Sequence, residues 1–242
     1  MPEWILKLVK DFNTAFIVDN RWKYITEGIG NTLILTFFAL ILGVVLGVVI
    51  AAIRTTYDKQ YHEMRSKFAK FLLSIANAIS RVYLTVIRGT PAMVQILIIF
   101  FIIMASSDNK MLCGIIAFGI NSGAYVAEII RGGIMSIDVG QTEAGRSLGF
   151  NYMHTMWFIV LPQTFKNILP ALANEFIVLL KETAIAGYVG VTDLTRGANI
   201  IRGITYQSFW PLMAIAAIYL VMVMFFTWLV DLLERRLRKS ER

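Results

Sequence analysis

The chain of 242 residues is 57% apolar and only 16% charged. A water-soluble protein of this length needs more polar surface to cover its core, so the composition indicates a membrane protein. The formal net charge of +7 would suit nucleic acid, but the basic residues lie mostly beside the ends of apolar segments, where positive charge orients membrane proteins. The single cysteine, Cys113, excludes a disulfide framework, and its apolar surroundings favour a small buried side chain.

Residues 1–30 are predicted to form an external segment. Charged side chains interrupt 1–23 and leave no cleavable hydrophobic core, so we expect no signal peptide. The first membrane span is predicted at 31–53, after Trp22 and Tyr24, which suit the water–lipid interface. Gly43-x3-Gly47 gives this span a small-residue face on which another helix can pack closely. Packing is the better-supported use of that face, and homodimerisation through it is the alternative.

The segment that follows is a polar, basic connector at 54–70. The next apolar stretch, 71–105, is too long for one simple span at about 1.5 Å per residue. It is interrupted by Arg88-Gly89-Thr90-Pro91, and proline disfavours helix at the residue before it. We therefore expect an amphipathic segment on the cytoplasmic side, a kink near Pro91, and a second span that occupies 82–105.

A short external turn leads into the third span, predicted at 111–130. This span is rich in small residues, which is typical of a helix that is buried among other helices. Beyond it lies a long polar loop, 131–170. Asp138 with Gln141 three residues later resembles a capping box, and Gly149 suits the left-handed residue that ends a helix. The loop thus predicts a helix between Asp138 and Gly149.

A second short helix is expected to begin at Asn151 and to end by Leu161, because Pro162 follows. Between the two helices we expect an elbow that exposes Phe150, Tyr152 and Met156, and exposed aromatic side chains at such a place call for a partner. From physical chemistry alone, an interfacial hairpin that lies against lipid headgroups explains the loop equally well.

Two more spans are predicted at 171–191 and 209–233, and a basic tail follows at 234–242. The fold class is therefore an all-α membrane protein with about five transmembrane helices, in which 31–233 form the membrane domain. An odd number of spans places the termini on opposite sides. The positive-inside rule favours a cytoplasmic C-terminus, polar loop and connector, and an external N-terminus.

Charged residues occur inside the predicted spans, where each costs about 2.5–3.5 kcal/mol and tends to face a partner or water. Glu128 and Arg131 can share one helix face, which favours a structural ion pair over a role in an inner gate. Lys181 and Glu182 are adjacent and point about 100° apart, so each needs another partner or a watery substrate pathway. Three polar residues suit the same pathway, although helix packing explains them almost as well: Asn121, Tyr125 and Thr183.

Two enzyme signatures are missing from the sequence. It contains no G-x4-G-K-[ST] phosphate loop and no H-E-x-x-H, so energy for any active process must come from another chain. His62 and His154 have no second ligand at metal spacing and are interpreted as surface residues. We expect neither a catalytic nor a metal site.

The polar loop carries the residues Glu143-Ala144-Gly145, then Gly149, Ile159, Leu161 and Pro162. This spacing resembles the EAA loop of the membrane subunits of bacterial ATP-binding-cassette importers, E-A-A-x3-G-x9-I-x-L-P, with glycine in place of the second alanine. In that family the loop docks onto a separate ATPase subunit. The resemblance therefore implies that these seven residues couple the chain to ATP hydrolysis.

The resemblance extends from about Gly28 to Arg236 and is strongest to permeases for polar amino acids in the histidine, glutamine and arginine branch. Its motifs are Gly30-Asn31-Thr32-Leu33, Arg88-Gly89-Thr90-Pro91 with Gln95, and the run Ala124–Ile134. Where many members read K-x-T-S-L, this chain has Lys181-Glu182-Thr183-Ala184-Ile185. That departure falls among the candidate pathway residues.

By resemblance, the chain is a permease subunit in the bacterial cytoplasmic membrane. Its implied partners are two ATPase subunits that carry ATP and Mg²⁺, a second permease subunit, identical or homologous, and an extracytoplasmic amino-acid-binding protein. The chain itself is expected to bind no cofactor. The alternative function is a secondary amino acid transporter or channel, which would work without an ATPase.

Overall fold

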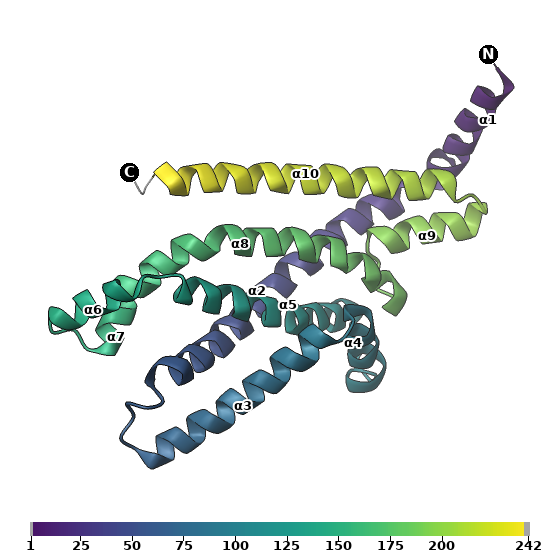
Figure 1. The fold of residues 1–242 in the computed structure, drawn as a ribbon. Helices are drawn as coiled ribbons and strands as arrows, with labels where there is room; N and C mark the ends of the chain where they lie inside the picture. The colour runs from purple at the N-terminus through teal and green to yellow at the C-terminus, as the bar shows by residue number, and fades with distance from the viewer. Residues whose placement is uncertain (1, 240–242) are drawn as a thin grey trace.

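The computed structural model describes residues 2–239, with side chains described as far as Leu237, and over this range the chain is helical without strands (Figure 1). The α-helices are α1 (Glu3–Phe12), α2 (Trp22–Gln60), α3 (Lys67–Gly89), α4 (Ala92–Ile98), α5 (Lys110–Met135), α6 (Val139–Ser147), α7 (Tyr152–Thr155), α8 (Leu161–Glu182), α9 (Leu194–Thr205) and α10 (Phe209–Lys239). Shorter π or 3₁₀ turns are η1 (Asn13–Ile17), η2 (Val18–Asn20), η3 (Ile99–Ile103), η4 (Met156–Val160) and η5 (Thr183–Val189).

Helices α2 and α5 pack against each other at the centre of the molecule. The Gly43 and Gly47 face of α2 lies on α5: a Cβ atom on Gly43 would lie 3.1 Å from Ser122 Cβ, and one on Gly47 would lie 2.5 Å from Val126 Cγ1. The predicted close-packing face is therefore used within the chain. Half of the residues of α5 are buried, including most of its small residues and Cys113, in agreement with the prediction.

Helix α9 is fastened to the N-terminal half of α2. The Asn31 Nδ2 donates to the Thr192 carbonyl at 2.7 Å, and the Leu194 N–H donates to Thr32 Oγ1 at 3.1 Å. Asp193 is fully buried and caps α9 by accepting from the amides of Thr195 and Arg196. Burial raises the pKa of the Asp193 carboxyl, and these amides work against that rise. Hydrogen bonds therefore hold the start of α9 against α2.

The chain turns sharply after α3. Thr90 is extended, Pro91 occupies the N-cap position of the next helix, and α4 with η3 then runs through Ile103. The kink predicted at Pro91 is confirmed. The expected second span, 82–105, is divided by this kink between the end of α3 and the shorter α4–η3 segment.

Four helices in the described range are long and apolar enough to cross a membrane: α2, α3, α5 and α10. The segment predicted as a fourth span, 171–191, lies on α8 and η5, and α8 begins ten residues earlier, at Leu161. Pro170 is accommodated inside α8. Of the predicted basic tail, residues 240–242 lie outside the described residues, and 234–239 continue α10 as helix.

Figure 1 shows two distinct ends of the bundle. The α6–α7 region, the turn between α2 and α3, and the C-terminal end of α10 lie toward one end, whereas α1 and α9 lie toward the other. The long helices α2, α8 and α10 connect these ends, so movement of one end can be transmitted along them.

Candidate functional site: an elbow and an arginine pocket

Residues 138–162 form the elbow, a helical hairpin whose first arm is α6. Asp138 caps α6 by accepting from the Gly140 N–H at 2.6 Å, as predicted. The arm ends at Gly149, which has a φ of +82°. The Phe150 N–H donates to the Gly145 carbonyl, and the Gly149 N–H donates to the Arg146 carbonyl, which together form a Schellman motif. The predicted helix and its left-handed glycine are therefore confirmed.

The capping box is only half formed. The Gln141 side chain does not reach back to the start of α6; its Oε1 accepts from Gln163 Nε2 at 3.4 Å. Gln141 thus links the two arms of the elbow instead of closing the first turn.

Gly145 is the single buried residue of α6 and forms the contact between the arms. A Cβ atom at this position would lie 2.9 Å from Thr155 Oγ1 and 3.0 Å from Ile159 Cδ1. The backbone of α6 therefore approaches the second arm more closely than alanine would allow without a shift in those side chains. Two positions of the EAA pattern, Gly145 and Ile159, meet at this contact.

The second arm does not end at Leu161, as the sequence suggested. Asn151 caps α7 as expected, accepting from the His154 N–H at 2.9 Å, but the helix continues through the π turn η4 directly into α8. Leu161 and Pro162 form the first turn of α8, where proline loses no hydrogen bond that an α-helix would make. The elbow is consequently continuous with a long helix of the bundle.

The surface of the elbow is apolar on the second arm. Met153, Trp157 and Phe158 are 57%, 63% and 69% exposed, and they line a pocket of about 320 Å³ with His154. Phe150 is exposed too, as predicted. Tyr152 and Met156, which were also predicted to be exposed, are half-buried. On the first arm, Glu143 and Ala144 are exposed. Exposed apolar side chains beside a polar arm are suited to a protein partner.

The elbow also contacts the turn between α2 and α3. Arg146 Nη2 lies 3.1 Å from Glu63 Oε1, although both side chains are more than half exposed. The same groove is lined by Glu143 and Tyr152, and burial raises the pKa of the Tyr152 hydroxyl. An ion pair thus joins the elbow to the connector, in addition to the covalent link of the elbow with α8.

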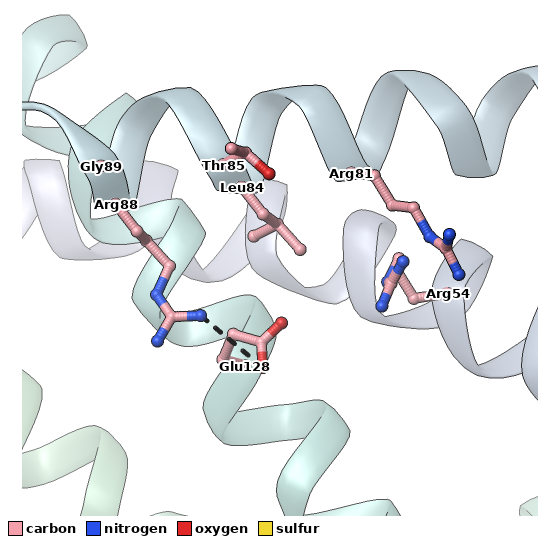
Figure 2. A pocket seen from close by; sticks show the side chains of 7 residues that line it. All are labelled: Arg54, Arg81, Leu84, Thr85, Arg88, Gly89 and Glu128. Carbon is pink, nitrogen blue, oxygen red and sulfur yellow. Dashed lines mark ion pairs between the residues drawn. The ribbon is translucent and has the colours of Figure 1, made fainter.

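A second site, the arginine pocket, lies between α2, α3 and α5 and has a volume of about 480 Å³ (Figure 2). Its lining consists of Arg54, Arg81, Leu84, Thr85, Arg88, Gly89 and Glu128. Figure 2 shows the side chains of Arg54 and Arg81 converging from α2 and α3, while Arg88 approaches Glu128 farther along α3. Of these residues, the sequence had singled out only Glu128 as part of a pathway or gate.

Glu128 and Arg131 form the ion pair that their spacing predicted, with Arg131 Nη2 3.1 Å from Glu128 Oε2. The same oxygen lies 3.8 Å from Arg88 Nη1, so a third residue shares the carboxylate. Arg88 in turn lies over the Tyr125 ring, 5.9 Å from its centroid. Tyr125 is 37% exposed and therefore borders the open side of this cluster.

Asn121 and Thr183 are buried and their polar groups are used inside the bundle. Asn121 Nδ2 donates to Gln95 Oε1 at 2.8 Å, and Thr183 Oγ1 donates to the Leu180 carbonyl at 2.7 Å. Gln95 Nε2 reaches back across the kink to the Ile87 and Thr90 carbonyls, which the end of α3 leaves without helical partners. These contacts favour the packing interpretation for Asn121 and Thr183, and they give Gln95 a structural role.

Comparison with known families assigns the fold. The family described as "Binding-protein-dependent transport system inner membrane component" matches residues 68–239. The chain belongs to this family. It is therefore a transport subunit and not an enzyme, in agreement with the missing enzyme motifs. Its relatives are inner-membrane proteins, and its four candidate spans agree with that location.

Individual relatives are similar over most of the permease chain. A putative glutamine transport system permease protein GlnP of Rickettsia typhi is 36% identical over 88% of this chain and 93% of its own length. The arginine transport system permease protein ArtQ of Bacillus subtilis is 35% identical over 90% and 94%. A crystal structure of an amino acid ABC transporter with histidines aligns with a TM-score of 0.79 and 42% identity, covering 91% of this chain and 98% of that one.

Within this permease, one acidic residue was overlooked as a candidate. Glu175 lies half-buried in α8, and its Oε1 accepts from Ser122 Oγ of α5 at 2.8 Å. Lys181 is exposed and Glu182 half-buried at the end of the same helix, and neither has an ion pair among the described residues. Glu175 could have been identified from the sequence, because a carboxylate inside an apolar segment by itself marks a candidate functional residue.

Proposed function

We propose that this permease moves polar amino acids into the cell as part of an ATP-binding-cassette importer and is driven through its elbow by a separate ATPase subunit. The relatives named for glutamine and arginine transport, and the solved amino acid transporter, support the substrate class. The observation that carries the proposal is the continuity of the elbow with α8, because a docking surface must be able to move the spans.

The elbow has the properties of a rigid lever. Its two arms are locked by the Gly145 contact and by the Schellman turn at Gly149. Its second arm passes without a break into α8, which carries Glu175, Lys181 and Glu182. When the ATPase subunits close around ATP, the docked elbow is displaced and α8 moves with it. Coupling is thereby assigned to seven residues: Glu143, Ala144, Gly145, Gly149, Ile159, Leu161 and Pro162.

The orientation follows from this role. We place the elbow, the turn between α2 and α3, and the C-terminal end of α10 in the cytoplasm, and the N-terminal segment outside. Figure 1 supports this arrangement, since the first three lie toward one end of the bundle and α1 toward the other. In the assembly, two ATPase subunits bind ATP and Mg²⁺, a second permease subunit, identical or homologous, completes the pathway, and an extracytoplasmic binding protein delivers the amino acid.

The substrate pathway is assigned to charged and polar groups that remain accessible. These are Tyr125, Glu128 and Arg131 on α5, and Lys181 and Glu182 at the end of α8. A zwitterionic substrate is suited to a route with charges of both signs. Asn121 and Thr183 border this route from buried positions and are expected to hold α4, α5 and α8 in place.

The elbow is tested by Glu143→Lys, which reverses one exposed charge on the docking arm. We expect the variant to fold and to keep its thermal stability, because Glu143 makes no ion pair in the described chain. Copurification of the ATPase subunits and substrate-stimulated ATP hydrolysis should both fall at least tenfold. Glu27→Lys, an exposed charge reversal on α2 near the opposite end, is the matched control.

Measurement of amino acid uptake into proteoliposomes distinguishes an ATP-driven importer from a secondary transporter or channel. The complex should accumulate amino acid only when ATP and Mg²⁺ are supplied to the ATPase side. Accumulation at an undiminished rate without ATP, or with Glu143→Lys, would contradict the lever.

A further inference from the structure

Helix α1, near the N-terminus, has an apolar face that the rest of the described chain leaves uncovered. At helical spacing its apolar residues fall together on one side and its charged residues on the other. No residue of α1 is buried, and its exposed large apolar side chains are Trp4, Leu6, Val9 and Phe12. A helix of 10 residues is marginal in water unless such a face packs against something. The face therefore requires an occupant.

The C-terminal end of α1 is fixed to the bundle. Trp210 Nε1, in the first turn of α10, donates to the Leu8 carbonyl at 3.1 Å, and Gln207 Nε2 donates to Asp11 Oδ1 at 3.1 Å. The Phe12 ring meets the Trp210 ring edge-on, with 5.3 Å between the centroids. Figure 1 shows α1 diverging from α10 beyond this attachment. The helix therefore has a fixed base, and the rest of its length lies outside the bundle.

This attachment places the base of α1 at the level of the membrane surface. Helices α2 and α10 are candidate spans, and tryptophan stands at the start of both, Trp22 in α2 and Trp210 in α10. Tryptophan is enriched where lipid meets water. Ring contacts continue from Phe12 through Trp210 to Phe209, which is exposed on α10. The apolar face of α1 is thus continuous with a surface that a span presents to lipid.

We infer that α1 is an interfacial helix that binds the bilayer surface, with Trp4, Leu6 and Val9 among the lipid chains and Lys7 and Lys10 at the headgroup phosphates. Neither lysine has an ion pair in the described chain. Two acidic residues balance the lysines, so the apolar face supplies the binding and not a net charge. The bilayer is favoured over a water-soluble partner because the face continues onto a span. Only its assignment to the external surface rests on the proposed function.

The test measures the depth of α1 in the permease complex with cysteine-free ATPase subunits, in phosphatidylcholine nanodiscs. A nitroxide is attached to Leu6→Cys or Val9→Cys on the apolar face, or to Lys7→Cys or Lys10→Cys on the polar face. Its collisions with oxygen, which concentrates in lipid, are compared with those with a water-soluble nickel chelate. The single native cysteine, Cys113, is buried, and the wild-type complex gives the background signal. Oxygen access should exceed chelate access severalfold on the apolar face, and the order should reverse on the polar face.

Two substitutions that change the charge of α1 equally assign the binding to its apolar face. Val9→Glu adds a negative charge to that face, and Lys10→Gln removes a positive charge from the opposite face. With the label at Leu6, Val9→Glu should raise chelate access severalfold, because a carboxylate is costly to place in hydrocarbon. Lys10→Gln should leave chelate access unchanged. Replacement of part of the phosphatidylcholine by phosphatidylglycerol should also leave it unchanged, since net charge does not supply the binding.

Equal chelate access at all four sites, or a depth that Val9→Glu does not change, would overturn the inference. So would labels at Leu6 and Val9 that neither oxygen nor chelate reaches, because a second copy or another protein would then cover the face. The side is measured separately, by reaction of Lys7→Cys with an impermeant maleimide in sealed vesicles of known orientation. Reaction from the cytoplasmic side alone would overturn the external assignment. The proposed transport fails in a different way, through the absence of ATP-driven uptake of every amino acid.

Discussion

Two glycine contacts hold different parts of this permease together, and they differ in what surrounds them. Between α2 and α5, Gly43 and Gly47 lie against buried residues of a helix that is itself enclosed. In the elbow, Gly145 is the single buried residue of α6, and the rest of that arm faces outward. The first contact is part of a close-packed scaffold, in which small residues let backbones approach. The second joins two exposed arms and leaves their outer faces free for a partner.

The scaffold should be the more sensitive of the two to added volume. Gly47→Leu would place side-chain atoms where Val126 and Ala127 already lie, and overpacking of this kind costs about 1–3 kcal/mol or more. We expect a large fall in thermal stability in detergent and in the yield of folded protein. Gly30→Leu, at an α2 position with no neighbouring atom within 4 Å of an added Cβ, is the control. Equal losses in the two variants would contradict the comparison.

In the elbow, backbone conformation should matter more than volume. Gly149 has a φ of +82° with no atom near an added Cβ, so Gly149→Ala is strained by about 1–2 kcal/mol for the left-handed conformation alone. The elbow should loosen while the bundle remains folded. We expect ATPase coupling to fall severalfold, with a small change in the melting temperature. Gly132→Ala on α5, at an equally open position with an ordinary φ, should leave both unchanged.

Of the three contacts, the ion pair between the elbow and the connector should contribute least to the stability of the protein. Arg146 and Glu63 are 53% and 57% exposed, and exposed pairs contribute about 0–1 kcal/mol. Arg146→Ala should therefore alter the melting temperature by no more than a degree or two. A double-mutant cycle with Glu63→Ala measures the coupling energy. A value well above 1 kcal/mol would show that the elbow is fixed to the connector more firmly than its exposure indicates.

Local signals allowed much of this structure to be anticipated. Asp138, Gly149 and Asn151 were identified as helix ends, because capping depends on side chains within a few residues. The kink at Pro91 followed from a missing amide and a steric clash, which are also local. Residues three apart on one helix, such as Glu128 and Arg131, were paired correctly for the same reason.

The errors share one cause. Proline after Leu161 was interpreted as a stop, but the π turn η4 leads into a new first turn that tolerates it, and this depends on the packing of the elbow. Gln141 was assigned to its own helix end and instead contacts Gln163 on the other arm. The hydrogen bond from Asn121 to Gln95, which favours the packing alternative for Asn121, could not be anticipated for the same reason.

The sequence by itself determined that this chain crosses a membrane, where several helix caps and the bend at Pro91 lie, and which polar loop carries the docking pattern. Apolar runs, caps and prolines act through neighbours along the chain, so they can be interpreted without a fold. Only the tertiary structure decided that Arg54 and Arg81 converge, that Ser122 reaches Glu175, and that the elbow runs unbroken into α8. Those relations join residues that are distant along the chain, and the direction of each side chain is set by how whole helices pack.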